Sequence, residues 1–219
     1  GVPDDTCEYC RTGRYNICPG VDFMATQPNY KGALTQYMTH PEEWTYHIPE
    51  GMTTMEGALV EPAAVGMHAA VLGGAQPGKS IVILGGGTIG LMVLQACISL
   101  GATDITVVDV IEKRLELAKK LGAARVINGK EEDTVAVLRS EEMYGDHGVD
   151  LVFEAAGAVF TAQQAVQIVS RGGKIMMVGT QSKPVPIDFL KINREVTIQT
   201  SFRYCNNFPQ TIEAISSGR

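Results

Sequence analysis

From about Ala63 onward, two kinds of hydrophobic pattern alternate along the chain. Short apolar runs such as "SIVILGGG" and "DITVVDV" are typical of strands that are buried on both faces of a sheet. Between them lie segments with apolar residues at helical spacing, including residues 88–100 and 111–123. Because short turns containing glycine join these segments, the alternation predicts a parallel sheet covered by helices on both faces.

The same patterns predict the remaining elements up to the C-terminal end of the sequence. Further strands are expected at "RVIN", "VDLVFEAAG", "GGKIMMVG" and "EVTIQTSF", which makes six, the number in a complete doubly wound α/β sheet. Further helices are expected at residues 131–143, 161–170 and 207–217. Residues 1–62 differ, because they hold six of the ten prolines and offer only short strand-like pieces such as "GALTQYMTH". We therefore expect two domains, residues 1–62 and 63–219.

Two phosphate-binding patterns follow one another near the first strand. Gly73–Ser80 matches G-x-x-x-x-G-K-[ST], but a triphosphate loop lies between a strand and a helix, and this segment precedes a strand. It is predicted to be a surface turn. Gly85, Gly87 and Gly90 match G-x-G-x-x-G between a strand and a helix, which is the dinucleotide-binding arrangement of a Rossmann domain. Gly85 permits the turn, Gly87 lets a pyrophosphate approach the backbone, and Gly90 lets the helix pack closely.

An acidic residue follows the glycine pattern at the expected distance. Asp109 ends the second predicted strand, where a carboxylate accepts hydrogen bonds from the adenosine ribose and repels a 2′-phosphate. NAD is therefore predicted rather than NADP. Arg114 argues in the other direction, because an arginine nearby can accommodate that phosphate.

The composition limits the classes of partner and the compartment. With a net charge of −6 and a pI near 5.2, the chain is not expected to bind nucleic acid or an anionic membrane. It contains no apolar run of roughly 20 residues that would span a bilayer, and it opens with no signal-peptide pattern. The sequence starts without Met and stops within a helical pattern at "ISSGR", so we expect a fragment of a longer protein. We expect that protein to be cytoplasmic.

The cysteines are unevenly distributed. Three of the five lie between Cys7 and Cys18, and an odd, clustered set favours a metal site in a reducing compartment over a disulfide framework.

Several motifs together resemble the zinc-containing medium-chain dehydrogenase/reductase family, and specifically its sorbitol (polyol, L-iditol 2-) dehydrogenase branch. They are "CEYCRTGRYNICPG" with "FMAT", "GALVEPAAVGMHA", "GGGTIGLM", "RGGKIMMVG" and "SFRYCNNFP". The resemblance implies that residues 1–62 are the tail of a GroES-like β domain with a zinc lobe. It also implies that the family's chain extends beyond both ends of this sequence.

The resemblance implies a structural zinc site in the cysteine cluster. The family spaces four thiolates as C-x2-C-x2-C-x7-C; Cys7, Cys10 and Cys18 match the last three, and Asp4 stands at the first. A closed site of one carboxylate and three thiolates is chemically reasonable for zinc. The alternative is a degraded site with three free thiols.

The resemblance also implies parts of a catalytic site. Glu61 matches a glutamate beside the catalytic zinc, whose other ligands belong to a stretch that this sequence lacks; the alternative is a carboxylate at a helix N-terminus, followed by Pro62 in the first turn. Arg203 and Tyr204 match residues that contact the sugar alcohol; the alternative is a surface cation beside a core aromatic. The positions that match cofactor contacts are Ile89, Val178, Gly179, Thr180, Ser201, Phe202 and Arg203.

The resemblance thus implies an NAD-dependent polyol dehydrogenase that oxidises sorbitol, xylitol or a relative to the ketose. Residues 1–219 by themselves are expected to be inactive, and the assembly is expected to be a homo-oligomer, either a dimer or a tetramer. Two alternatives stay open: a zinc-free, NADPH-dependent quinone or enoyl reductase, and a non-catalytic nucleotide-binding module. Asp109, Glu61 and the cysteine cluster argue against the first of them.

Overall fold

The computed structural model describes residues 1–24, 26, 31–192 and 194–218. The chain forms two compact units. The first unit comprises Gly1–Ala64 and Phe202–Arg219, and the second comprises Val65–Ser201. The domain boundary between residues 62 and 63 stays a prediction.

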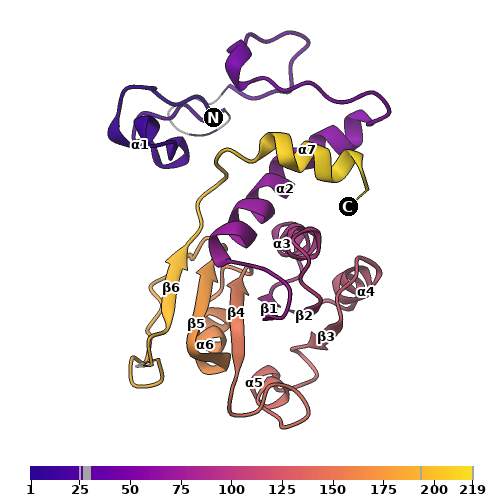
Figure 1. The fold of residues 1–219 in the computed structure, drawn as a ribbon, viewed down its shortest axis with the longest axis vertical. Helices are drawn as coiled ribbons and strands as arrows, with labels where there is room; N and C mark the ends of the chain where they lie inside the picture. The colour runs from indigo at the N-terminus through magenta and orange to yellow at the C-terminus, as the bar shows by residue number, and fades with distance from the viewer. Residues whose placement is uncertain (25, 27–30, 193, 219) are drawn as a thin grey trace. The chain divides into compact units, whose positions relative to one another are not determined.

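The second unit is built on a parallel sheet of six strands in the order β3-β2-β1-β4-β5-β6. Figure 1 shows this order from β6 at the left to β3 at the right. It is the strand order of the Rossmann fold, and it confirms the predicted α/β class. The strands are β1 (Ser80–Leu84), β2 (Asp104–Asp109), β3 (Arg125–Asn128), β4 (Val149–Glu154), β5 (Val169–Met177) and β6 (Thr197–Thr200).

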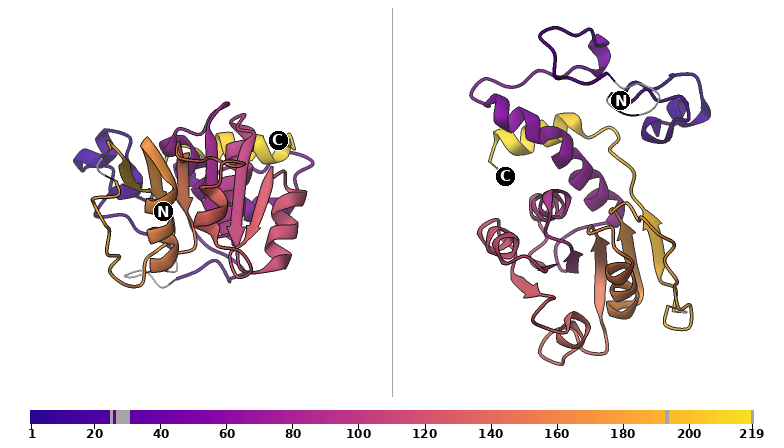
Figure 2. Two further views of the ribbon diagram at one scale, coloured as in Figure 1. Left: turned by 90° about the horizontal axis from the view of Figure 1, so that it is seen from below. Right: turned by 180° about the vertical axis from the view of Figure 1, so that it is seen from behind.

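Helices cover both faces of this sheet because alternate strand residues point to opposite sides. Ile81 and Ile83 of β1 belong to one apolar cluster and Val82 to another. The first cluster includes α3 (Thr88–Ser99) and α4 (Glu112–Lys120), whereas the second includes α5 (Thr134–Leu138) and α6 (Val159–Ile168). The two further views in Figure 2 show the same helices around the strands.

Two helices in the second unit differ in extent from the prediction. Residues 131–143 form only the short helix α5, which begins after Asp133; the side chain of Asp133 accepts hydrogen bonds from the amides of Val135 and Ala136. This cap fixes the start of the helix there, so the acidic residues before it lie outside. Helix α6 ends at Ile168, two residues before the predicted end, because Val169 already pairs with Val149 in the sheet.

The first unit has little regular structure in its N-terminal part. Among the described residues, its elements are a turn of helix, α1 (Glu8–Arg11), two short 3-10 helices, η1 (Tyr15–Ile17) and η2 (Glu42–Trp44), the first part of α2 (Thr54–Gly73), and α7 (Phe208–Ser216). An isolated antiparallel bridge joins Val2 and Asp22. The strand-like piece at residues 32–40 forms no strand: it pairs with no strand among the described residues, and an extended segment needs such a partner to form a sheet.

Helix α2 (Thr54–Gly73) begins well before the sequence analysis placed a helix. Thr53 and Glu56 form a capping box, in which the Thr53 amide donates to the Glu56 carboxylate at 2.7 Å and the Glu56 amide donates to the Thr53 hydroxyl at 3.2 Å. Pro62 therefore lies inside the helix, where it removes one backbone donor. The alternative that put Glu61 at a helix N-terminus is wrong.

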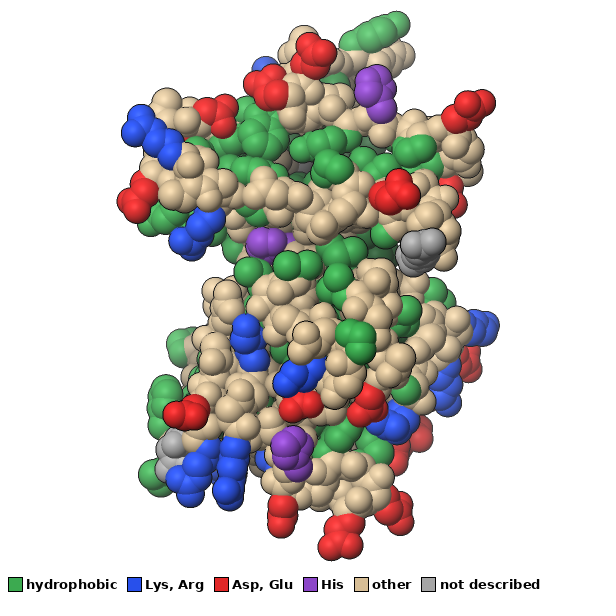
Figure 3. Space-filling model, in the orientation of Figure 1, with side chains coloured by type: hydrophobic (Ala, Val, Ile, Leu, Met, Phe, Trp, Pro, Cys, Tyr) green, Lys and Arg blue, Asp and Glu red, His purple; other side chains and the backbone are tan. Residues whose placement is uncertain are grey.

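The surface carries charges of both signs. On the face shown in Figure 3, acidic side chains (red) are interspersed with basic ones (blue). Of the helices in the described part of the chain, none combines the length and the apolar character needed to cross a membrane.

Candidate cofactor and substrate sites

The glycine turn after β1 is too closely packed for larger residues at two of its three positions. Gly85 has a φ of +109°, and a Cβ built on it would lie 2.8 Å from the amide nitrogen of Ala156. A Cβ on Gly90 would clash with the carbonyl oxygen of Gly85. Helix α3 can therefore approach the end of β1 this closely only with glycine at residue 90.

Gly87 differs from the other two glycines. It precedes the first residue of α3, and a Cβ built on it would meet nothing within 4 Å. The backbone at this position is thus open on the side where a side chain would project. An open backbone beside amide groups at a helix N-terminus fits a diphosphate, which needs exposed N–H donors and close approach.

Asp109 lies at the end of β2, as predicted, and its side chain turns toward the glycine turn. The carboxylate is buried, with 7% of the residue exposed. Its Oδ2 accepts a hydrogen bond from the Gly86 amide at 2.7 Å, and its Oδ1 accepts from the amides of Val110 and Ile111 at 2.8 and 2.9 Å. The carboxylate therefore holds the loops after β1 and β2 together.

Arg114 lies beside Asp109, in the first turn of α4. Its Nη1 is 3.4 Å from Asp109 Oδ2, and about half of its side chain is exposed. The guanidinium keeps donors facing solvent while it pairs with the buried carboxylate. A negative and a positive side chain therefore lie together at the end of β2, and this pair is compatible with either NAD or NADP.

The other predicted cofactor residues of the second unit lie at or near the carboxyl ends of strands. Ile89 packs partly buried against the first apolar cluster from α3. Val178, Gly179 and Thr180 follow β5, and the Ser201 amide donates to the Met177 carbonyl at 2.9 Å after β6. Ligands of open α/β sheets bind at this edge. Sequence analysis missed Glu154, although it ends a strand just as Asp109 does.

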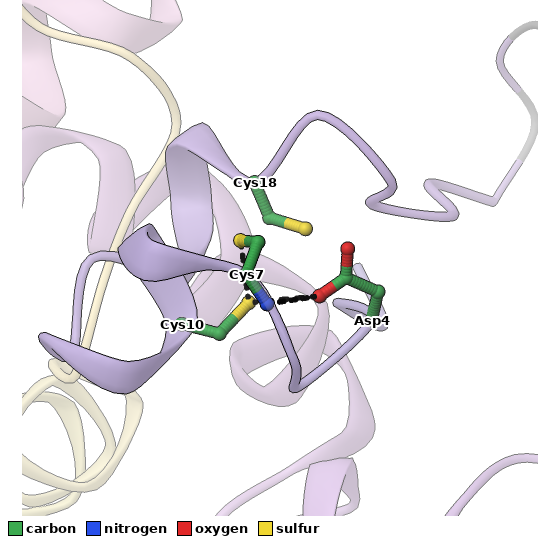
Figure 4. Close-up of side chains that lie close together, drawn as sticks. All are labelled: Asp4, Cys7, Cys10 and Cys18. Atoms are coloured by element: carbon green, nitrogen blue, oxygen red, sulfur yellow. Dashed lines mark hydrogen bonds between the residues drawn. The ribbon is translucent and has the colours of Figure 1, made fainter.

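The four predicted zinc ligands of the first unit converge. One ligand atom from each of Asp4, Cys7, Cys10 and Cys18 lies within 4.8 Å of the others, and Figure 4 shows the four side chains pointing toward one another. The Cys7 and Cys10 sulfurs are 3.4 Å apart, and Cys10 Sγ lies 3.5 Å from Asp4 Oδ1. Three sulfurs and one oxygen at this spacing fit a tetrahedral zinc ion.

The carboxylate of this cluster is held in its charged form. The amides of Cys7 and Thr6 donate to Asp4 Oδ1 at 3.0 and 2.8 Å, and these bonds lower the pKa of Asp4 to about 2. An ionised carboxylate that is already oriented by two amides is suited to serve as the fourth ligand. Asp4 is six residues before Cys10 in the sequence, and the two amide bonds hold its side chain beside the start of α1.

Arg203, Tyr204 and Glu61 come together in the first unit. Burial raises the pKa of Tyr204, and the negative charge of Glu61 raises it further, so the phenol stays protonated and can donate.

The Arg203 guanidinium carbon lies 3.9 Å from the ring centroid of Phe23 and 4.7 Å from that of Phe202. Its Nη1 is buried without a hydrogen-bond partner within the described ranges. Arg203 and Tyr204 line a small hollow with Tyr15, Asn16, Val21 and Phe23.

The segment before Cys18 holds the loop that carries Arg203. The Gly13 carbonyl accepts hydrogen bonds from Cys205 Sγ at 3.0 Å and from Asn206 Nδ2 at 2.8 Å. The Tyr15 hydroxyl accepts from the Asn206 amide at 2.7 Å. Arg203 and Asn206 have φ values of +54° and +57°, a conformation that non-glycine residues adopt rarely and that these bonds sustain.

The triphosphate-loop pattern has no phosphate-binding geometry, as predicted. Gly73 is the last residue of α2, and the segment passes through exposed turn residues into β1, which begins at Ser80. No helix begins at Lys79, so its amides form no helix N-terminus.

Comparison with known proteins gives the family. The model of the zinc-binding dehydrogenase family matches residues 88–217, more than half of the chain. A sorbitol dehydrogenase from Bacillus subtilis is 41% identical over 221 residues, covering 100% of this chain and 62% of that protein. An Escherichia coli oxidoreductase/dehydrogenase of unknown specificity superposes with a TM-score of 0.97 at 64% identity, covering 100% of this chain and 62% of that one.

A third similar protein carries a cofactor. A Sinorhizobium meliloti protein, solved with NADP bound, superposes with a TM-score of 0.90 at 26% identity and covers 99% of this chain and 64% of that one. The chain therefore spans less than two thirds of the length of each of these relatives. The chain belongs to the zinc-binding dehydrogenase family.

Proposed function

We propose that the full-length protein containing this chain is an NAD-dependent polyol dehydrogenase that oxidises a sorbitol- or xylitol-like substrate to a ketose. The substrate class is supported by the 41% identity to a sorbitol dehydrogenase and by the Arg203–Tyr204 pair, which lies beside Glu61. The chain alone is expected to be inactive, because most residues expected to hold a catalytic zinc are outside this sequence.

One observation carries the dehydrogenase proposal. The open backbone at Gly87 and the buried carboxylate of Asp109 flank the same turn, joined by the hydrogen bond from the Gly86 amide. Amides at the start of α3 would hold the diphosphate of a dinucleotide, and Asp109 Oδ2, paired with Arg114, would face the adenosine ribose. The loop after β5, with Val178, Gly179 and Thr180, would lie beside the nicotinamide.

The remaining site residues would bind and orient the polyol. A catalytic zinc would supply Lewis-acid chemistry at the substrate hydroxyl, and Glu61 is the residue of this chain that would lie beside it. Arg203, fixed against two aromatic rings, presents guanidinium donors to hydroxyl oxygens. The Tyr204 phenol stays protonated and would donate to a second hydroxyl of the substrate. The exposed Glu61 carboxylate would accept from that hydroxyl or from a water molecule near the metal.

Two further parts of the proposal concern the zinc lobe and the assembly. Asp4, Cys7, Cys10 and Cys18 would hold a structural zinc, with no ligand position left open for substrate. The full-length enzyme is proposed to be a cytoplasmic homo-oligomer, a dimer or a tetramer.

The proposal is tested with purified full-length protein, its zinc content measured, and a set of polyols. We expect NADH to form with sorbitol or xylitol, NADP to be a poorer acceptor, and the rate to vanish after chelation and return with zinc.

One observation favours a second candidate, a zinc-free, NADPH-dependent quinone or enoyl reductase. Arg114 keeps half of its side chain exposed beside Asp109, where it could contact a 2′-phosphate. Reduction of a quinone with NADPH by the metal-free full-length protein, with no polyol oxidised, would establish this alternative and overturn the first.

A further inference from the structure

Glu154 is a buried carboxylate that none of the predicted roles uses. It ends β4 with 0% of the residue exposed. Its Oε1 accepts hydrogen bonds from the amides of Ala156 and Gly157 at 3.0 and 2.9 Å and from the Thr161 hydroxyl at 2.7 Å. Its Oε2 accepts from Gln181 Nε2 at 2.7 Å. A buried carboxyl group is tolerated where hydrogen-bond donors satisfy its oxygens in this way.

These partners come from two different loops. Ala156, Gly157 and Thr161 belong to the turn after β4 and the first turn of α6, whereas Gln181 belongs to the loop after β5. The backbone of Glu154 joins the same loops, since its carbonyl accepts from the amides of Val178 and Gly179 at 2.8 and 2.9 Å. One residue therefore holds the loop after β5 against β4 through both its backbone and its side chain.

The two loops approach each other more closely than side chains would permit. A Cβ on Gly157, which has a φ of +69°, would lie 2.7 Å from the Thr180 carbonyl oxygen. A Cβ on Gly179 would clash with the Gly157 amide and lie 2.9 Å from Glu154 Oε2. The position of Gly179 and Thr180 is thus set by contact with Gly157 and by the hydrogen bonds of Glu154.

Only the nitrogen of the Gln181 side-chain amide takes part in the contact between the two loops. Its Nε2 donates to Glu154, while its Oε1 is buried and has no hydrogen-bond partner in the described residues. Such an unpaired buried acceptor is disfavoured, so the side chain is held there by the bond to Glu154. Breaking that bond removes the polar contact that orients Gln181.

We propose that Glu154, acting through Gln181, is a positioning residue for the nicotinamide half of the cofactor. The inference rests on the proposed function, which puts Val178, Gly179 and Thr180 beside the nicotinamide. Glu154 itself does not touch the cofactor. It keeps the loop after β5 in the geometry that the nicotinamide ring needs, while the adenosine half is bound at Asp109 and the glycine turn, away from Gln181.

The experiment uses the full-length protein and two probes, NADH and ADP-ribose, which lacks the nicotinamide. Gln181→Glu places a second carboxylate against Glu154, and two facing buried carboxylates repel. We expect NADH to bind at least roughly tenfold more weakly and ADP-ribose to bind as in the wild type. In the double variant Glu154→Gln/Gln181→Glu the donor and the acceptor exchange places, but the carboxylate at residue 181 has fewer donors, so NADH affinity should recover in part.

A second variant distinguishes a local effect on cofactor binding from misfolding of the Gln181→Glu protein. Gln181→Ala removes the donor without adding charge, so it should weaken NADH binding in the same direction with less effect on Tm. Asp150→Asn is the matched control, because Asp150 accepts hydrogen bonds from Ser80 at the opposite end of β4. It should lower Tm and leave the affinities for both probes unchanged.

The outcomes separate this inference from the proposed function. Equal weakening of NADH and ADP-ribose, unchanged NADH affinity in both Gln181 variants, or no recovery in the double variant would each overturn the positioning role. Wild-type protein that binds neither probe would overturn the proposed function, and this inference with it.

Discussion

The Oδ2 atom of Asp109 accepts a hydrogen bond from the Gly86 amide at a distance of 2.7 Å. This bond joins the end of β2 to the turn after β1, and the other carboxylate oxygen is occupied by the amides of Val110 and Ile111. Asp109 is therefore fixed before any ligand arrives. A ribose would meet a carboxylate that is already oriented and needs no rearrangement.

Arg114 should influence the choice between the two nicotinamide dinucleotides. Because its guanidinium pairs with Asp109 at 3.4 Å and is half exposed, Arg114→Ala should remove most of any NADP affinity. NAD affinity should change by less than about twofold, since exposed ion pairs contribute little. Dissociation constants of the full-length protein for both cofactors check this, with exposed Lys113→Ala on the same helix as the control. Equal loss of NAD and NADP affinity would contradict the assignment.

The cysteine cluster should bind one zinc ion per chain. Cys10→Ser removes one of three thiolates, so zinc should dissociate from the lobe at much lower chelator concentration, as expected when a ligand is lost. Zinc content by elemental analysis and a chelator competition measure the effect. Cys205→Ser is the control, because Cys205 donates to the Gly13 carbonyl outside the cluster. Zinc retention that is the same in wild type and Cys10→Ser would favour the degraded site.

Asp150 should give part of the stability a defined dependence on pH. Burial acts to raise the pKa of Asp150, but hydrogen bonds from Ser80, with the charges of Lys79 and His147, outweigh it and lower the pKa. A lowered folded-state pKa stabilises the fold above the ordinary value of 3.8, and this stabilisation is lost as the pH falls through the folded-state pKa.

The variant Asp150→Asn isolates this contribution. We expect it to lower the free energy of unfolding by about 1 kcal/mol at pH 7. The difference from wild type should shrink as the pH is lowered below 3.8. Urea unfolding at several pH values measures both. A difference that stays constant down to pH 3 would show that the Asp150 charge is not responsible.

Arg203 should govern polyol affinity more than cofactor affinity. Arg203→Lys keeps the charge but loses the planar fork and the contacts with the rings of Phe23 and Phe202. KM for the polyol should rise roughly tenfold in the full-length enzyme, with a smaller rise in KM for NAD, because Arg203 also matches a cofactor contact. Arg14→Lys is the matched control, because Arg14 lies over the Tyr9 ring at 5.9 Å, outside the proposed site. The same rise in both variants would argue for a general structural effect.

The strands were predictable because β1, β2 and β4 are buried on both faces and read as continuous apolar runs. The convergence of Asp4 with the three cysteines was predictable from local spacing, since all four lie within fifteen residues. The start of α2 was missed even though Thr53 and Glu56 carry the capping-box pattern, because Pro62 suggested a later beginning.

Other parts of the site depend on contacts that single-sequence patterns do not report. The hydrogen bond from Gln181 to Glu154 joins residues 27 positions apart, and the bond from Asn206 to Gly13 joins residues 193 positions apart. A polar residue at the carboxyl end of a strand was the available signal for Glu154, by analogy with Asp109. The segment at residues 32–40 resembles a strand in sequence, but a strand also needs a partner, and a local pattern does not identify one.

Gly87 gives the most direct test of the cofactor site. Its backbone is proposed to face the diphosphate, and a Cβ built on it would meet no atom within 4 Å. With a φ of −71° it accepts alanine without strain, so Gly87→Ala in the full-length protein should unfold at the wild-type Tm. The added methyl group would stand where the diphosphate approaches, and the dissociation constant for NAD should rise at least roughly tenfold. Wild-type Tm together with wild-type NAD affinity in Gly87→Ala would contradict the account.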